Sequence, residues 1–152
     1  MKLFTLLATA GFAAVSSINI AQAEGQSKAQ ANVVEVFKSP TCGCCSKWVE
    51  HLREAGFQVS VSHVINPSAT RRRLGIADRY GSCHTASVGG YAIEGHVPAA
   101  DIKRLLTSRP KAVGLAVASM PPGSPGMESA NPVPYETVLV QADGGAQVYA
   151  RH

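Results

Sequence analysis

The alternation of apolar and polar residues predicts three elements between residues 33 and 62. Residues 33–37 are almost continuously apolar and rich in β-branched side chains, which is typical of a central strand covered on both faces. Apolar residues then recur at helical spacing from Cys42 to Ala55, and Gly56 is a typical helix stop. Residues 57–61 alternate as a half-buried strand does. A strand, a crossover helix and a second strand predict a parallel pair.

A second helix, a hairpin and a third helix follow. Residues 68–79 look helical, and residues 86–88 and 91–93 flank Gly89-Gly90, a two-residue hairpin signal. Residues 99–106 predict a helix that ends before Pro110. The predicted order is β-α-β-α-β-β-α. Because the hairpin adds antiparallel strands to a parallel pair, the fold class is α/β with a mixed sheet flanked by helices.

The pattern changes in the C-terminal part of the chain. Residues 107–134 are rich in proline and glycine, so we expect them to form no regular structure, and a loop of this length is often functional. Residues 138–140 and 147–150 surround Asp143-Gly144-Gly145 and predict a last hairpin.

The N-terminal residues predict export. Lys2 precedes an apolar run over residues 3–20, and Ala21-Gln22-Ala23 follows, which together are typical of a secretory signal peptide over residues 1–23. A membrane anchor is the alternative, but polar residues dilute the run and no stop-transfer flank follows it. We therefore expect a soluble, periplasmic mature protein with no membrane insertion.

Size and charge narrow the class of protein. A chain of 152 residues with 16% charged side chains fits one globular domain. A formal net charge of +4 is too small to predict a nucleic-acid partner, and the run Arg71-Arg72-Arg73 is interpreted as the solvated face of a helix.

Four cysteines carry the candidate chemistry. Cys42 and Cys45 form a C-x-x-C pair that follows a strand and opens a helix, the context of thioredoxin-like redox sites, and Cys44 lies between them. The helix dipole and the unpaired N–H groups of a first turn favour thiolates there. A structural Cys42–Cys45 disulfide with Cys44 buried is one alternative. Zinc is another, although three thiols on one arm and Cys83-His84 on the other are unusual for it.

Soft sulfur ligands select Cu(I). The chain offers four thiols, the thioethers of Met120 and Met127 in the proline-rich stretch, and the imidazoles of His84 and His96. Each methionine or histidine taken alone has a plainer structural explanation, which is weakest for Met127 because its neighbours belong to a loop.

Four motifs in order carry a resemblance to a known family. They are Cys42-Gly43-Cys44-Cys45 after Lys38-Ser39-Pro40-Thr41, then Ser82 to Ala86, Gly90 to Ala99, and Met120 to Glu128. Together they resemble the CopG-type copper-resistance proteins, over almost the whole mature chain. The resemblance implies a thioredoxin-like domain over residues 24–110, carrying the C-x-C-C motif, and a Pro/Gly-rich C-terminal extension over residues 111–152 that helps to bind metal.

The resemblance also implies a function. Cys42, Cys44, Cys45 and Cys83 would hold a cysteine-bridged copper site of several ions, with Met127 and, less directly, His84 completing it. Cu(I) and Cu(II) would interconvert in support of copper export. We expect the electrons to leave either the cluster or the pair of Cys42 and Cys45, and we expect a monomer with periplasmic copper-export or chaperone proteins as partners. The roles of Glu94, His96 and Met120 stay open. A thiol-disulfide oxidoreductase using Cys42 and Cys45, and a passive copper chaperone or store, are the alternatives.

Cys83-His84-Thr85 stands where thioredoxins place a cis-proline, so a ligand occupies the position at which a peptide would dock. This favours metal binding over disulfide exchange.

Overall fold

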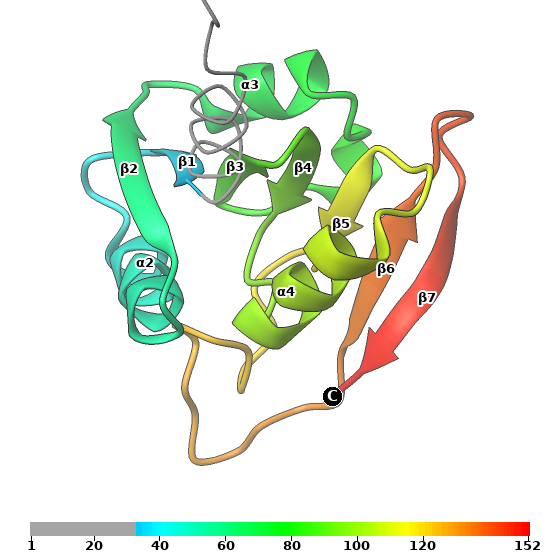
Figure 1. The fold of residues 1–152 in the computed structure, drawn as a ribbon. Helices are drawn as coiled ribbons and strands as arrows, with labels where there is room; N and C mark the ends of the chain where they lie inside the picture. The colour runs from blue at the N-terminus through cyan, green and yellow to red at the C-terminus, as the bar shows by residue number, and fades with distance from the viewer. Residues whose placement is uncertain (1–32) are drawn as a thin grey trace, which may run out of the picture.

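The structure is a computed structural model that describes residues 33–152. The predicted signal peptide, residues 1–23, lies outside the described residues. Within them, helices flank a seven-stranded mixed sheet (Figure 1). The strands are β1 (Val33–Lys38), β2 (Gln58–His63), β3 (His84–Val88), β4 (Tyr91–Glu94), β5 (Gly114–Ala116), β6 (Glu136–Val140) and β7 (Ala146–Arg151). The helices are α2 (Gly43–Glu54), α3 (Pro67–Arg73) and α4 (Ala99–Ser108), with a short 3₁₀ helix at Asp78–Tyr80.

The strand order is β2-β1-β3-β4-β5-β6-β7. β1 is parallel to β2, and β3 is antiparallel to both β1 and β4, so the predicted parallel pair and hairpin are confirmed. β1 lies inside the sheet, as its apolar run predicted. These four strands with α2, α3 and α4 make up the predicted thioredoxin-like arrangement.

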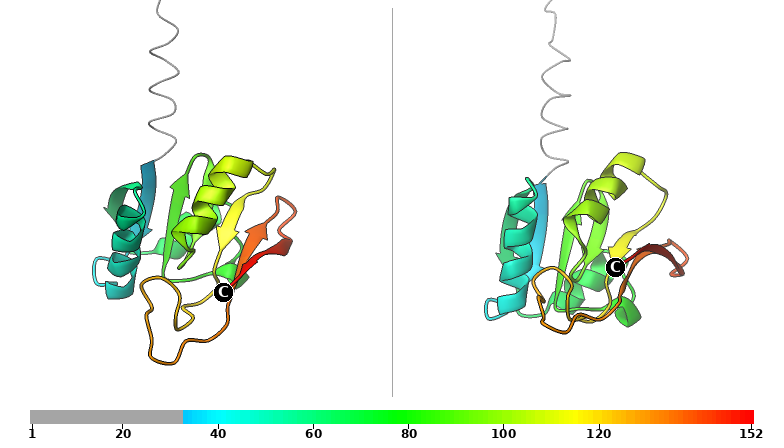
Figure 2. Two further views of the ribbon diagram at one scale, coloured as in Figure 1. Left: turned by 60° about the horizontal axis from the view of Figure 1, so that its bottom comes forward. Right: turned by 90° about the horizontal axis from the view of Figure 1, so that it is seen from below.

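The two faces of the sheet are covered by different elements. α2 and α4 pack on one face, where Trp48, Leu52, Ile102 and Leu105 are fully buried in one cluster with β1 and β3. On the other face, Ile76 of the segment after α3 packs against strands β4, β5 and β6. Figure 2 shows α2 and α4 side by side and the long loop after β5 passing below them.

α3 is shorter than the helix predicted over residues 68–79. Asn66 caps its start, because its side-chain oxygen accepts the Ala69 N–H at 3.3 Å. The helix ends at Arg73 because Gly75 adopts a left-handed φ of 87°, a common helix stop that the periodicity did not reveal. The prediction of a solvated Arg71-Arg72-Arg73 face is also wrong for Arg71, which is buried.

β5 was missed because it lies in the stretch expected to be irregular. It is only three residues long, and it is held from both sides, by β4 and by β6. A Cβ at Gly114 would lie 1.7 Å from the Ala92 carbonyl oxygen, so the glycine that argued against a strand is what lets the two backbones meet.

The C-terminal residues continue the same sheet. β6 and β7 form the predicted last hairpin, and together with β5 they extend the sheet beyond β4. The irregular loop that joins β5 to β6 passes the N-terminal end of α2. Among residues 33–152, no helix is long and apolar enough to cross a membrane.

Candidate metal centre

The start of α2 positions three of the four thiols. Cys42 immediately precedes the helix, and its N–H donates to the Ser39 carbonyl at 3.2 Å, which turns the chain at the end of β1. Cys44 and Cys45 lie in the first turn. That turn carries no acidic side chain and no side-chain cap, so its N–H groups and dipole favour negatively charged sulfur.

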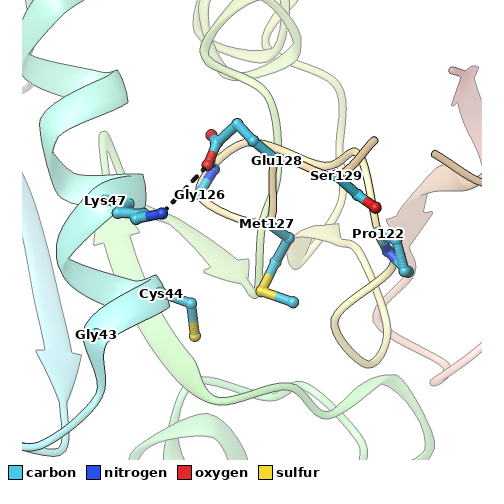
Figure 3. A pocket seen from close by; sticks show the side chains of 8 residues that line it. All are labelled: Gly43, Cys44, Lys47, Pro122, Gly126, Met127, Glu128 and Ser129. Carbon is cyan, nitrogen blue, oxygen red and sulfur yellow. Dashed lines mark hydrogen bonds and ion pairs between the residues drawn. The ribbon is translucent and has the colours of Figure 1, made fainter. Parts of the chain in front are cut away.

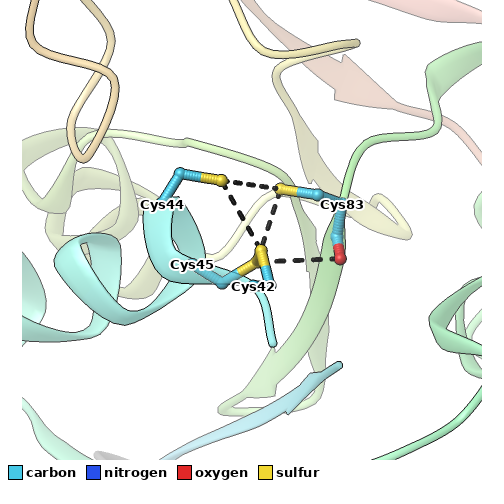
Figure 4. Close-up of side chains that lie close together, drawn as sticks. All are labelled: Cys42, Cys44, Cys45 and Cys83. Carbon is cyan, nitrogen blue, oxygen red and sulfur yellow. Dashed lines mark hydrogen bonds between the residues drawn. A yellow bond between two sulfur atoms is a disulfide. The ribbon is translucent and has the colours of Figure 1, made fainter. Parts of the chain in front are cut away.

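Cys83 lies next to these thiols. It precedes β3, whose first residue, His84, pairs with Lys38 at the end of β1. Cys83 Sγ lies 3.5 Å from Cys45 Sγ and 3.8 Å from Cys44 Sγ (Figure 4). All four sulfur atoms lie within 4.8 Å of one another. The structure therefore brings the four predicted sulfur ligands together. Every described peptide bond is trans, and Cys83 occupies the expected position opposite the C-x-C-C turn.

Cys42 and Cys45 are joined in a disulfide, and Cys44 and Cys83 are free. Cys45 is fully buried, whereas Cys42 and Cys44 are partly exposed. The alternative of a structural disulfide also required a buried Cys44, and Cys44 instead lines a pocket. Coordination by four thiolates requires two-electron reduction of the disulfide.

Two histidines extend the cluster on the side of Cys83. His96 donates its Nδ1–H to the Pro125 carbonyl at 2.8 Å, which leaves the Nε2 lone pair facing Cys83 Sγ at 3.1 Å. Metal-binding histidines are typically oriented in this way by a hydrogen bond from the other ring nitrogen. His84 Nδ1 lies 3.4 Å from the same sulfur, and its buried Nε2 has no partner among residues 33–152. Cys83, His84 and His96 form a second group of possible ligands.

The sequence analysis assigned no role to His96, although the predicted hairpin could have placed it. In the β3–β4 hairpin Thr85 pairs with Glu94, so the residues after β4 return to the end of the sheet where Cys83 lies.

Burial keeps these ligands neutral without a metal. It lowers the pKa of His84 to about 3, with His96 and Lys38 adding to the effect, and it also lowers the pKa of His96. Burial and the neighbouring Cys44 raise the pKa of the Cys83 thiol to about 12. Both imidazoles are therefore free to bind metal at neutral pH. Cys83 is expected to lose its proton when a metal ion takes the proton's place.

The proline-rich loop brings Met127 to the side of the cluster where Cys44 lies. Gly126 adopts a left-handed φ of 82°, and a Cβ there would lie 2.7 Å from the Cys44 carbonyl oxygen, so the loop packs directly on the first turn of α2. Met127 and Cys44 both line a pocket of about 510 Å³ (Figure 3), and Lys47 and Glu128 form an ion pair at its rim. Met120 is exposed and does not line this pocket.

A buried carboxylate holds Cys83 in place. Glu94 is fully buried and accepts the Ser82 N–H at 2.7 Å, the Thr85 hydroxyl, and one N–H of the buried Arg71 at 3.4 Å. Burial raises the pKa of Glu94, and these three donors oppose that rise. Because Ser82 adjoins Cys83, the pair of Glu94 and Arg71 fixes the backbone that presents this thiol.

Comparisons with known proteins identify one family model and two similar solved structures. Residues 80–127 match a family described as protein of unknown function, DUF411. Two solved structures of a copper resistance protein called CopG, form 1 and form 2, are each similar to this chain at 42% identity and a TM-score of 0.75. The alignments cover 79% of this chain and 96% and 97% of those chains. No curated protein matches the chain.

The first prediction concerns the buried ion pair of Glu94 and Arg71. Glu94→Ala leaves the Ser82 amide unpaired and removes the buried partner of the Arg71 guanidinium, and we expect the free energy of unfolding to fall by about 3–5 kcal/mol. Denaturant unfolding measures this loss. Asp78→Ala is the control, because Asp78 is an exposed partner of the same arginine, and its removal should cost at most about 1 kcal/mol. Equal losses for the two variants would contradict the role given to Glu94.

The second prediction concerns pH. Because the folded-state pKa of His84 is lowered, the unfolded chain binds a proton that the folded chain does not, so stability falls as pH drops below about 6.5. This residue alone accounts for about 2 kcal/mol between pH 7.5 and pH 5. In metal-free protein, His84→Phe should remove that part of the dependence. Replacing the exposed His63 by Gln should leave the dependence as it is, and an unchanged slope in His84→Phe would refute the assignment.

Proposed function

The chain belongs to the CopG family of copper resistance proteins, and on this premise we propose that it binds several copper ions in the periplasm and interconverts Cu(I) and Cu(II) in support of copper detoxification and export. The observation that carries the proposal is the meeting of four sulfur atoms within 4.8 Å of one another at the start of α2 and β3. Clustered thiolates are the ligands that Cu(I) prefers, and one sulfur can bridge two ions.

The proposed ligands are the four thiols, the Met127 thioether and the His84 imidazole. The geometry adds His96, whose Nε2 faces Cys83. Two groups of ligands share Cys83, one made of the thiols and one containing both histidines. Together they offer more donors than a single Cu(I) ion uses, which supports a site of several ions bridged by cysteine sulfur.

Cys42 and Cys45 are the proposed redox pair. When their two thiolates form the disulfide, two electrons are released, and each electron reduces one Cu(II) to Cu(I). The reverse step consumes two electrons from two Cu(I) ions and regenerates the thiolates. The disulfide in the structure is one end state of this reaction.

A thiol-disulfide oxidoreductase is the second candidate, and the same disulfide supports it. Cys42 is partly exposed at a helix start and Cys45 is buried beneath it, as expected for an attacking and a resolving thiol. This candidate requires metal-free protein to reduce insulin disulfides, and to keep doing so after Cys44→Ser and Cys83→Ser. Absence of turnover removes it.

The third prediction concerns copper capacity. With the disulfide reduced under anaerobic conditions, titration with Cu(I) against a competing chelator should give more than one tightly bound ion per chain. Cys83→Ser should lower that number, because this thiol belongs to both ligand groups. His63→Gln is the matched control, since His63 is exposed at the end of β2 and belongs to neither group. An unchanged copper number in Cys83→Ser would rule out the four-thiol site.

The fourth prediction tests redox chemistry against passive storage. Reduced, metal-free protein mixed with Cu(II) without oxygen should produce about two Cu(I) ions for each Cys42–Cys45 disulfide formed. A Cu(I)-specific chelator counts the ions, and mass spectrometry identifies the disulfide. The double variant Cys42→Ser, Cys45→Ser should lower the yield by about two ions per chain. A yield that does not change in the double variant would assign the electrons to other groups and refute Cys42 and Cys45 as the redox pair. No formation of Cu(I) by the wild type would leave a passive copper store.

A further inference from the structure

The sulfur cluster is reached through two pockets that share no lining residue. One is the pocket of about 510 Å³ at Cys44 and Met127, called here the thioether pocket. The other has a volume of about 330 Å³ and opens at Cys42 and Cys83, and we call it the hydroxyl pocket. It is lined by Ser39, Thr41, Cys42, Asn66, Pro67, Ser68, Ser82 and Cys83. The sulfur cluster therefore has two chemically different approaches, one at Cys44 and one at Cys42 and Cys83.

The thioether pocket suits a soft metal ion. It offers sulfur from a thiol and from a thioether, and Cu(I) passes between such ligands by exchange. The hydroxyl pocket offers hydroxyl and amide groups, no thioether and no charged side chain. Apart from the two cysteines, its lining holds nothing that a soft metal ion prefers.

The hydroxyl pocket is where the disulfide can be attacked, because Cys83, at the position where thioredoxins place a cis-proline, lines this pocket without covering Cys42. Cys45 is fully buried, so the accessible sulfur of the pair belongs to Cys42, which lines this pocket. Hydrogen-bonding groups line the same pocket from three separate segments, before α2, at the start of α3 and before β3. Ser39 bonds to Thr41 and Ser68 to Asn66, so these groups are held in place, and their remaining lone pairs can accept main-chain N–H groups of an extended segment from another protein.

An exposed apolar side chain stands beside the same pocket. Ile65 immediately precedes the lining residue Asn66 and is fully exposed, more than any other large hydrophobic side chain among residues 33–152. Fixed hydrogen-bonding groups beside an apolar anchor fit a protein surface, because a small thiol would reach Cys42 without touching Ile65.

We propose that the hydroxyl pocket and Ile65 form the docking surface for a protein dithiol that reduces the Cys42–Cys45 disulfide, while copper uses the thioether pocket. This inference rests on the proposed function, because it names the source of the electrons that renew the redox pair. Copper and the reducing partner then reach the same cluster through different pockets.

The proposed reduction conserves bonds, electrons and protons. A thiolate of the partner attacks Cys42 Sγ, the Cys42–Cys45 bond breaks, and Cys45 leaves as a thiolate that takes up a proton. The second thiol of the partner attacks the mixed disulfide and releases Cys42 as a thiolate. The partner is oxidised to its own disulfide, and this chain gains two electrons.

The fifth prediction separates docking from simple chemical access. Oxidised, metal-free protein is mixed with reduced thioredoxin as a protein dithiol, or with dithiothreitol as a small one, and thiol release is followed. Ile65→Ser should slow reduction by thioredoxin about fivefold, the effect of losing about 1 kcal/mol of contact, and leave the rate with dithiothreitol unchanged. Val148→Ser is the matched control, since Val148 is an exposed apolar residue on the far edge strand, β7. It should change neither rate.

The point of attack gives a second readout. A thioredoxin with its resolving cysteine replaced should be trapped on Cys42, as shown by mass spectrometry after an acid quench. Equal thioredoxin rates in the wild type and in Ile65→Ser, or trapping on Cys44 or Cys83, would overturn the proposal. Reduction by small thiols alone would also overturn it.

Failure of this inference and failure of the proposed function can be told apart. The reduction assay contains no copper, and the Cu(I) titration contains no protein dithiol. Ile65→Ser should bind as many copper ions as the wild type, because Ile65 belongs to neither ligand group. Weak copper binding by the wild type would refute the proposed function, whereas normal copper binding with no effect of Ile65→Ser on thioredoxin would refute only the docking surface.

Discussion

The hydrogen bond from the Ser82 amide to the buried carboxylate of Glu94 ties the end of β4 to the residue before Cys83. Cys44 and Cys83 are 39 positions apart in the chain, and their sulfurs lie 3.8 Å apart only if the segment before β3 is held still. A buried carboxylate is costly unless it is fully paired, and Arg71, Thr85 and Ser82 supply the pairing. The position of Cys83 thus depends on a charge network on the side of the sheet away from α2.

The other ligands are also held by the main chain rather than by one another. The turn after β1 places Cys42, and the contact of Gly126 with the first turn of α2 brings Met127 to the cluster. The Pro125 carbonyl orients His96 in the same loop. The buried core around Trp48 and Leu52 holds α2 against the sheet, and the fully buried Cys45 in the first turn of that helix belongs to the same buried set. The packing of α2 therefore fixes where the C-x-C-C turn lies.

Local sequence patterns predicted the elements that carry the cysteines, and long-range contacts account for what they missed. β1, α2 and the β3–β4 hairpin follow from short patterns, so the meeting of Cys83 with the C-x-C-C turn could be predicted. β5 could not, since three residues form a strand only because β4 and β6 pair with them. The run of three arginines predicts a surface position for Arg71. Its burial is explained only by the contact with Glu94, which is 23 positions away in the chain. His96 required the hairpin register together with the position of Pro125.

Under the proposed function, thiol oxidation and copper binding compete for the same atoms. Forming the Cys42–Cys45 disulfide removes two of four thiolates, while Cys44 and Cys83 stay free beside it. The disulfide form keeps two free thiols, Cys44 at the thioether pocket and Cys83 beside His84 and His96. A cluster that needs bridging sulfur then loses capacity when its own pair is oxidised. The redox state of Cys42 and Cys45 would thus decide both how many electrons the site holds and how much copper it retains.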